Sequence, residues 1–210
     1  MSPASGKIVI ASRNTGKIKE IRSILSNSGV TIRSLDDYPN LPDIAEDGHS
    51  FLENAFKKAK SIAEAIGETV LADDSGLEVE ALNGAPGIYS ARYAGEEGDD
   101  KKNILKLLHD MKDVPTMKRK AVFRCVLVLY RREGRYHVFD GIWEGRIAEV
   151  PTGKEGFGYD PVFYLPERGV TAAELPEEIK NRISHRGLAT EKLKMWIENE
   201  YWNAGRSAAR

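Results

Sequence analysis

The chain has 210 residues, 41% of them hydrophobic, which is enough for one substantial buried core. Its 31 basic and 32 acidic residues give a formal net charge of −1, so no overall positive field would attract nucleic acid. An anionic ligand would therefore have to be held by local cations. The single cysteine, Cys125, excludes an internal disulfide and a cysteine-based zinc site, and its position in an apolar run indicates a buried thiol.

The sequence contains neither a signal-peptide pattern nor an apolar segment long enough to span a membrane. We therefore expect a cytoplasmic protein with no membrane partner and no nucleic-acid partner. We also expect one domain over residues 1–203, followed by a frayed tail over 204–210, where the residues are mostly small and polar.

The first predicted elements are a strand at 7–11, a polar turn and an amphipathic helix. The turn consists of Ser12, Arg13, Asn14, Thr15, Gly16 and Lys17. Unpaired N–H groups and the helix dipole favour an anion at such a position. The turn does not match the phosphate-binding P-loop, which would require glycine at Ala11 and a hydroxyl at Ile18. It is therefore either a capped helix entry or a phosphate site of another kind.

A second helix is predicted to begin after Ser50, because Ser50 and Glu53 have the spacing of a capping box, and to end near Gly67. Lys57 is expected on the solvent side of this helix, although the sequence does not decide whether Lys57 or Lys58 contacts phosphate. Lys58 lies on one flank of the apolar stripe, so its ammonium either follows the protein surface or reaches a phosphate.

Two adjacent acids, Asp73 and Asp74, end the apolar run at 69–72. A carboxylate on a buried strand is costly unless a cation or hydrogen bonds compensate it. Because strand side chains alternate between faces, Asp73 and Asp74 should point opposite ways and should not bind one ion together. A metal at Asp74 would take its second carboxylate from elsewhere, and Glu46 is the best upstream candidate. The alternative interpretation is an Asp-Ser-Gly turn between two strands.

The second half of the chain is predicted to contain a half-exposed strand at 77–81, a turn at 83–84 and a helix beginning at Asp99 or Asp100. The helix should bury Ile104, Leu105, Leu108 and Met111. Two strong strands at 121–130 and 136–143 should form a hairpin, which 142–150 extends. The sheet should therefore be mixed, with antiparallel portions.

A glycine-rich loop at 151–161 carries Phe157 and Tyr159. Glycine allows a close approach of the backbone, and an aromatic face can stack on a nucleic-acid base for about 1–3 kcal/mol, although loop aromatics also commonly fill small cores. Polar and cationic side chains then crowd before a final predicted helix at 188–202: Lys180, Asn181, Arg182, Ser184, His185 and Arg186. An anion there would relieve unfavourable charge at a helix start, whereas the simpler interpretation is a solvated face.

Six segments together resemble the inosine triphosphatase family, the Ham1-like pyrophosphatases of non-canonical purine nucleoside triphosphates. They are residues 12–17, 46–48 with 51–55, 72–77, 84–93, 156–161 and 184–186. The resemblance covers nearly the whole chain and has no departure at a motif position. It implies an α/β fold in which a long curved mixed β-sheet with flanking helices divides two lobes, a nucleotide cleft between the lobes, and a homodimer.

The resemblance also implies Mg²⁺-dependent hydrolysis of ITP, dITP and XTP to the monophosphate and pyrophosphate. Glu46 and Asp74 would bind the metal, Asp74 would accept the proton of the attacking water, and Asp73 would be a supporting acid. The phosphates would contact Ser12, Arg13, Asn14, Thr15, Gly16, Lys17, Lys58 and Ser75. Phe157 would stack on the base, beside Gly158, Tyr159 and Asp160. The keto oxygens of the base would face Lys180, His185 and Arg186.

The chemistry of these residue types agrees with that implication. Mg²⁺ prefers a few carboxylates together with water and phosphate oxygens. Donors opposite O6 would favour inosine or xanthine, because the amino group of adenine would leave them unpaired.

Two other functions are possible alternatives for a chain with these residues. The Maf-like nucleotide pyrophosphatases prefer pyrimidine or modified nucleotides, and Phe157 with the Ser-His-Arg segment at 184–186 argues against them. A catalytically silent nucleotide-binding module would require the loss of a metal ligand, whereas Glu46 and Asp74 are both present. The residues do not rank ITP, dITP and XTP or fix the number of metal ions.

Overall fold

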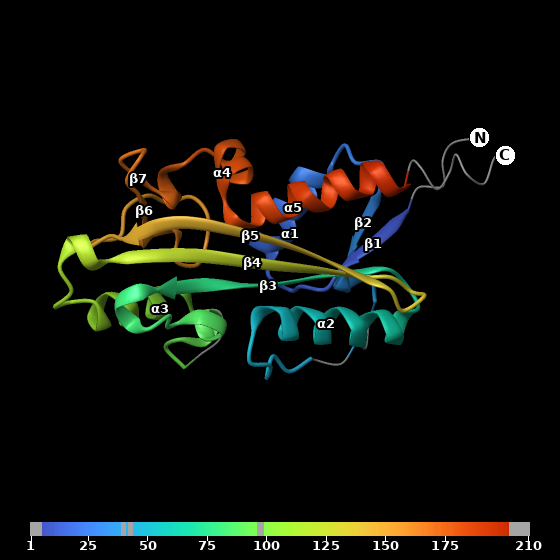
Figure 1. Cartoon of the computed structure of the whole chain (residues 1–210), viewed down its shortest axis with the longest axis horizontal. Helices are drawn as coiled ribbons and strands as arrows, with labels where there is room; N and C mark the ends of the chain where they lie inside the picture. The colour runs from blue at the N-terminus through green and yellow to red at the C-terminus, as the bar shows by residue number, and fades with distance from the viewer. Residues whose placement is uncertain (1–5, 39–40, 42–43, 96–98, 202–210) are drawn as a thin grey trace. The chain divides into compact units, whose positions relative to one another are not determined.

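The computed structural model describes residues 6–38, 41, 44–95 and 99–201 (Figure 1). The expected tail at 204–210 lies outside these residues. The strands are β1 Lys7–Ile10, β2 Thr31–Ser34, β3 Val70–Val79, β4 Lys120–Tyr130, β5 Tyr136–Ile147, β6 Phe163–Leu165 and β7 Val170–Thr171. The α-helices are α1 Thr15–Leu25, α2 Phe51–Ile66, α3 Asp100–Asp110, α4 Glu177–Ile183 and α5 His185–Trp196, which continues as a π-helical turn, Ile197–Tyr201. Among the described helices, none combines the length and the apolar character that a membrane span requires.

The strands form a seven-stranded sheet in the order β2-β1-β3-β4-β5-β6-β7. β1 pairs in parallel with β2 and with β3, whereas β6 pairs antiparallel with β5 and with β7. β4 and β5 are joined by a tight turn in which Arg131 N donates to Arg135 O at 2.8 Å. The predicted α/β fold with a mixed sheet, flanking helices and a β4–β5 hairpin is thus confirmed.

The chain packs as two compact units. The first comprises Met1–Asp74, Val126–Asp140 and Arg186–Arg210, and the second comprises Ser75–Cys125 and Gly141–His185. The expected single domain over 1–203 and the cleft between lobes stay predictions.

In the first unit, α2 packs one apolar face on the sheet. Ala55, Ala59 and Ile62 share a buried cluster with Val9 of β1 and Ala72 of β3. Strand alternation then turns Asp73 to the opposite face, where its carboxylate bonds to Lys17 of α1 and Arg186 of α5. Figure 1 accordingly shows α1 and α5 together on the side of the strands away from α2.

In the second unit, one buried cluster joins residues of the sheet, of α3 and of the segment 159–175. Leu77 of β3, Phe123 of β4 and Trp143 of β5 pack in one cluster with Ile104 and Leu107. The prediction that Leu105 belongs to the buried face of this helix was wrong, because its side chain is 66% exposed. Residues 104, 107 and 111 keep the three- and four-residue spacing of the buried face, and Leu105 lies outside it.

The stretch around Asp73 and Asp74 is continuous strand. β3 runs for ten residues through the Asp-Asp-Ser-Gly segment, so the alternative of a turn at this point was wrong. The strand ends at Val79, two residues before the predicted end, and a 3₁₀ turn, Glu80–Leu82, follows. The predicted turn at 83–84 is present, with positive φ at Asn83 and Gly84.

One helix start and one capping interaction differ from their predictions. α5 begins at His185 and not at 188, so His185 and Arg186 are part of its first turn. α2 begins where predicted, with Ser50 Oγ accepting from Glu53 N at 3.2 Å. The carboxylate of Glu53 accepts from His49 N at 2.7 Å, one residue before the position that a reciprocal capping box would use.

Candidate functional site

Asp73 is the centre of a buried ion-pair cluster in the first unit. Its side chain accepts from Lys17 Nζ at 2.6 Å and from Arg186 Nε at 2.8 Å. Arg186 is 2% exposed and also donates through Nη1 to Glu20 Oε2 at 2.7 Å. Burial alone would raise the pKa of Asp73, but Arg186 and Lys17 outweigh it and hold that pKa well below its usual range. Asp73 is therefore a permanent anion that fixes two cations.

Asp74 lies in a different environment, on the α2 side of β3. It is 5% exposed, and the side chain of Asn54 on α2 lies close enough to lower its pKa. Burial raises the pKa of Asp74 to about 6, Lys17 and Lys58 oppose the rise, and Glu46 adds to it. The predicted opposite orientation of the two acids is thus confirmed, and Asp74 is the acid whose charge is poorly compensated.

Glu46 and Lys58 lie within electrostatic reach of Asp74. The Lys58 ammonium pairs with Glu46 Oε1, and both side chains are largely buried. Lys57 is different, because its side chain is 43% exposed and its ammonium pairs with Asp47. The structure therefore brings Glu46, Asp74 and Lys58 together and leaves Lys57 toward solvent.

The predicted phosphate turn is the entry into α1. Asn14 is the N-cap, with its side-chain oxygen accepting from Lys17 N at 3.0 Å, and Asn14 N donates to Ser12 Oγ at 3.1 Å. Thr15, Gly16 and Lys17 form the first helical turn, which contains no acid. The positive end of this 11-residue helix is therefore uncompensated by its own sequence, and the exposed Arg13 adds a cation just before it.

The second unit contains the predicted base-contacting loop at 156–160. Asp160 is 2% exposed and accepts from Phe157 N at 2.9 Å and from the Lys180 ammonium. The same ammonium lies 4.8 Å from the centre of the Phe157 ring, which is a cation–π contact. Phe157, Asp160 and Lys180 are therefore locked to one another.

Other residues of this loop have structural partners. The Tyr159 hydroxyl donates to Ser90 O at 2.8 Å, and the ring belongs to the buried core. Gly158 N donates to Asp100 Oδ2 at 2.7 Å. At Gly156, a Cβ would lie 2.0 Å from Asp160 Oδ2, so a larger residue would collide with that carboxylate.

His185 and Ser75 complete the predicted set. His185 is buried, and its ring stacks on Phe123 with centroids 4.6 Å apart and a 9° interplanar angle. The ring of Trp143 is also stacked with that of His185, with centroids 6.3 Å apart and a 20° interplanar angle. Ser75 follows Asp74 in β3 and is half-buried.

Three residues at these places were not assigned a site role from the sequence: Glu20, Asn54 and Asp100. Glu20 and Asn54 could have been noticed as polar residues on otherwise buried helix faces. Asp100 gave no signal beyond that of a helix start, because its partner Gly158 lies 58 residues further along the chain.

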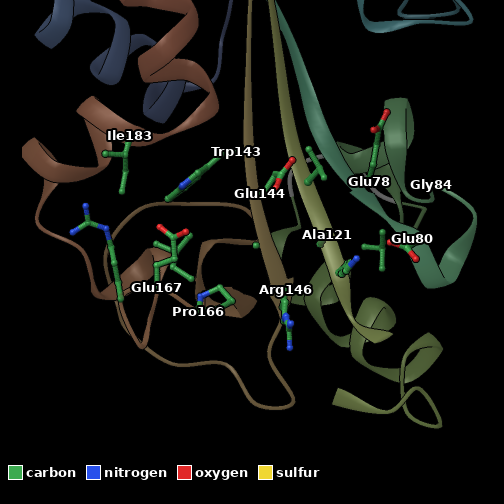
Figure 2. A pocket seen from close by; sticks show the side chains of 16 residues that line it. Glu78, Glu80, Gly84, Ala121, Trp143, Glu144, Arg146, Pro166, Glu167 and Ile183 are labelled. Atoms are coloured by element: carbon green, nitrogen blue, oxygen red, sulfur yellow. The ribbon is translucent and has the colours of Figure 1, made fainter. Parts of the chain in front are cut away.

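A pocket of about 830 Å³ in the second unit contains none of the predicted site residues. Figure 2 shows Trp143 and Glu144 of β5 on its wall, with Pro166 and Glu167 from the segment after β6. Four glutamates accompany its three cations, so the pocket lacks the positive character that a triphosphate requires. Within the described residues, no group of three or more His, Cys, Asp or Glu could hold a metal ion.

Comparison with known proteins defines the class of this fold and site. The family model described as "Ham1 family" matches residues 8–196, and the chain belongs to that family. The solved Ham1 protein of Staphylococcus aureus superposes with a TM-score of 0.82 at 44% identity, covering 92% of this chain and 99% of that one. The fold is thus that of Ham1 proteins.

Individual relatives carry a more specific name. The dITP/XTP pyrophosphatase of Halalkalibacterium halodurans is 49% identical over 190 residues, which are 90% of this chain and 98% of the relative. That of Clostridium perfringens is 51% identical over 194 residues, covering 90% and 95%. A solved dITP/XTP pyrophosphatase of Mycobacterium abscessus has a TM-score of 0.73 at 44% identity, with 89% and 97% covered.

Proposed function

We propose that this protein is a Mg²⁺-dependent pyrophosphatase that converts ITP, dITP or XTP to the monophosphate and pyrophosphate, and so cleanses the nucleotide pool. The relatives named dITP/XTP pyrophosphatase support the reaction. The observation that carries it is the buried Asp74. Burial and the charge of Glu46 destabilise its ionised form, and Lys17 and Lys58 offset this only in part. Such a group gains from a cation and can take a proton at neutral pH.

The residues present fit a magnesium ion. Glu46 and Asp74 supply two repelling carboxylates, and Mg²⁺ commonly uses one or two carboxylates with water and phosphate oxygens. Bound Mg²⁺ would clamp phosphate oxygens and make water a better nucleophile. Asp74 would orient the attacking water and accept its proton while the bond between the α- and β-phosphates breaks and pyrophosphate leaves.

The negative charge of the triphosphate would be offset by cationic side chains and backbone donors of the first unit. The N-terminus of α1 offers backbone donors and a helix dipole at Ser12 to Lys17. Lys17 and Lys58 add charge and are held in place by Asp73 and Glu46. Asp73 would therefore act on the reaction indirectly, through the position of Lys17.

The base would be recognised by the second unit together with Arg186. The ring of Phe157, already oriented by Lys180, would stack on the purine. Lys180 and His185 are donors that could face keto oxygens, and we extend this role to Arg186 although two of its nitrogens already bond to Asp73 and Glu20. A homodimer, which the family resemblance implies, and the cytoplasmic location expected from the sequence complete the proposal.

A substrate panel tests this function. Purified protein with Mg²⁺ is assayed against ITP, dITP, XTP, GTP, ATP and dTTP under identical conditions. We expect kcat/KM for ITP and XTP to exceed that for ATP by at least about a hundredfold, the discrimination available when buried donors are left unpaired. Equal turnover of all six, or preference for dTTP, would contradict the proposal. The Asp74→Asn variant, purified identically, controls for contaminating phosphatases.

A further inference from the structure

We infer that Asp100 is a positioning residue for the loop that carries Phe157, because its carboxylate holds the Gly158 amide at 2.7 Å. The inference rests on the proposed function, since it concerns the loop to which we assign the purine base. No residue of α3 belongs to the predicted site, so Asp100 extends the site to a further element.

The loop needs an anchor at this point. Gly156 and Gly158 adopt φ values of +76° and +60°, and glycine loses more conformational freedom on ordering than other residues. Asp160 holds the Phe157 amide on one side of Gly158, and Ser90 O holds the Tyr159 hydroxyl on the other. The bond to Asp100 fixes the peptide between them, and a bond to an ionised carboxylate is stronger than a neutral one.

Asp100 can act as an anchor because its own position is fixed. It lies in the first turn of α3, whose Ile104 and Leu107 are buried in the core. In the next turn, Asn103 accepts from Ala94 N at 2.7 Å and donates to Ala91 O at 3.1 Å. The helix start is thereby tied to the preceding chain, and the carboxylate of Asp100 is held by a rigid element.

The neighbouring Asp99 offers a matched control. Asp99 is the N-cap of α3, and its Oδ1 accepts from Lys102 N at 3.0 Å. Both acids therefore favour the same helix end, but Asp100 is the one that bonds to the loop. Asp99→Ala removes a helix cap and leaves the Gly158 bond in place, whereas Asp100→Ala removes the Gly158 bond.

Loss of the anchor should affect base binding and leave the phosphate chemistry intact. A stacking platform contributes equally to the ground state and the transition state, so its disorder raises KM without lowering kcat. For Asp100→Ala we expect KM for ITP to rise about fivefold, a typical worth of one such hydrogen bond, with kcat within twofold of wild type. KM for ATP should rise by the same factor, since stacking tolerates every base.

The kinetic experiment compares wild type with Asp100→Ala, Asp100→Asn and Asp99→Ala. Inorganic tripolyphosphate, which has no base, should inhibit all four with the same Ki. Asp100→Asn keeps an acceptor oxygen, so its KM for ITP should lie close to that of wild type. The KM of Asp99→Ala should equal that of wild type. If Asp99→Ala raises KM as much as Asp100→Ala, or if Asp100→Ala loses kcat, the inference is wrong. If Asp100→Asn is as impaired as Asp100→Ala, an acceptor oxygen at this position does not restore the loop, and the inference is wrong.

A second readout separates this inference from the proposed function. In ¹⁵N–¹H spectra, an amide bonded to a carboxylate resonates downfield, so the Gly158 peak should move upfield in Asp100→Ala and hold its place in Asp99→Ala. An unchanged Gly158 peak in Asp100→Ala would overturn the anchor itself. Absence of ITP turnover by the wild type, with the expected peak shift present, would refute the proposed function and leave the anchor standing.

Discussion

Asp73 and Asp74 are adjacent in sequence and differ in almost every physical respect. Asp73 is paired with Lys17 and Arg186, which stabilise its charge, whereas Asp74 is buried with weaker compensation beside Glu46. Strand alternation is the cause, because it sends one carboxylate toward α1 and α5 and the other toward α2. Substitution of each acid should therefore have a distinct signature.

For Asp74→Asn, we predict loss of activity together with a gain of stability in metal-free protein. Burial raises the pKa of Asp74 to about 6, above the value of about 3.9 in an unfolded chain. Its stabilising contribution is full below pH 4 and is lost as pH rises through 6, so at pH 8 the ionised group destabilises the fold. The free energy of unfolding of the variant should exceed that of wild type by about 3 kcal/mol at pH 8, and the two should be equal at pH 4. Equal effects at both pH values in urea titrations would contradict this.

For Asp73→Asn, we predict a loss of stability and a smaller loss of activity than for Asp74→Asn. Removing the charge takes away the acid that pairs with Lys17 and one of the two acids that pair with Arg186, the other being Glu20. Breaking a buried ion pair by removing one partner costs about 3–5 kcal/mol. The activity per folded molecule should fall less than in Asp74→Asn, because Asp73 contacts neither metal nor water in the proposed reaction. Equal losses of kcat in the two folded variants would show that Asp73 takes part in the chemistry.

At the scale of elements, the amphipathic patterns predicted strands and helices well where the contacts are local. Asn14 begins α1 as its N-cap, and Gly67 ends α2 as a left-handed C-cap, which are positions that these residue types commonly occupy. β3 was harder, because an Asp-Asp-Ser-Gly segment is typical of a turn. The cations that allow it to remain a strand lie 56 and 113 residues away, so no local pattern could reveal them.

The same distance dependence limits prediction of the site. The residue types of the phosphate turn and the acids were recognisable from the chain alone. The partners Glu20 and Asp100 were not, since their bonds to Arg186 and Gly158 span 166 and 58 residues. Family resemblance supplied roles for residues such as His185, whose buried ring stacked on Phe123 has no signature in the local sequence.

Two glycines of the base loop give a prediction at this scale. Gly156 and Gly158 both have positive φ, but a Cβ at Gly156 would collide with Asp160 Oδ2, whereas nothing lies within 4 Å of a Cβ at Gly158. Gly158→Ala should cost about 1 kcal/mol of unfolding free energy through backbone strain alone. Gly156→Ala should cost more and should raise KM for ITP severalfold, because Asp160 must move away from Phe157 N. Indistinguishable variants in unfolding and KM measurements would contradict the collision.

At the scale of the whole molecule, a formal net charge of −1 coexists with local cations at α1 and α2. Lys17 and Lys58 are each paired with an acid, so they are oriented before substrate arrives, and the net charge gives no hint of them. Anion binding here depends on arrangement and not on overall charge.

Magnesium should couple to the stability of the fold through Glu46 and Asp74. A cation that binds the native state stabilises it by RT ln(1 + [L]/Kd), so Mg²⁺ should raise the melting temperature of wild type at pH 8. The shift should be absent in Asp74→Asn, and Ca²⁺ should substitute less well in turnover. An equal Mg²⁺ shift in wild type and variant would place the metal elsewhere.

The central claim is tested most directly by the products formed from ITP. We predict that ³¹P NMR of wild-type protein with ITP and Mg²⁺ will show inosine monophosphate and pyrophosphate appearing in equal amounts, with no orthophosphate. Asp74→Asn under the same conditions should leave ITP intact. Formation of inosine diphosphate with orthophosphate, or equal turnover by the variant, would contradict the account.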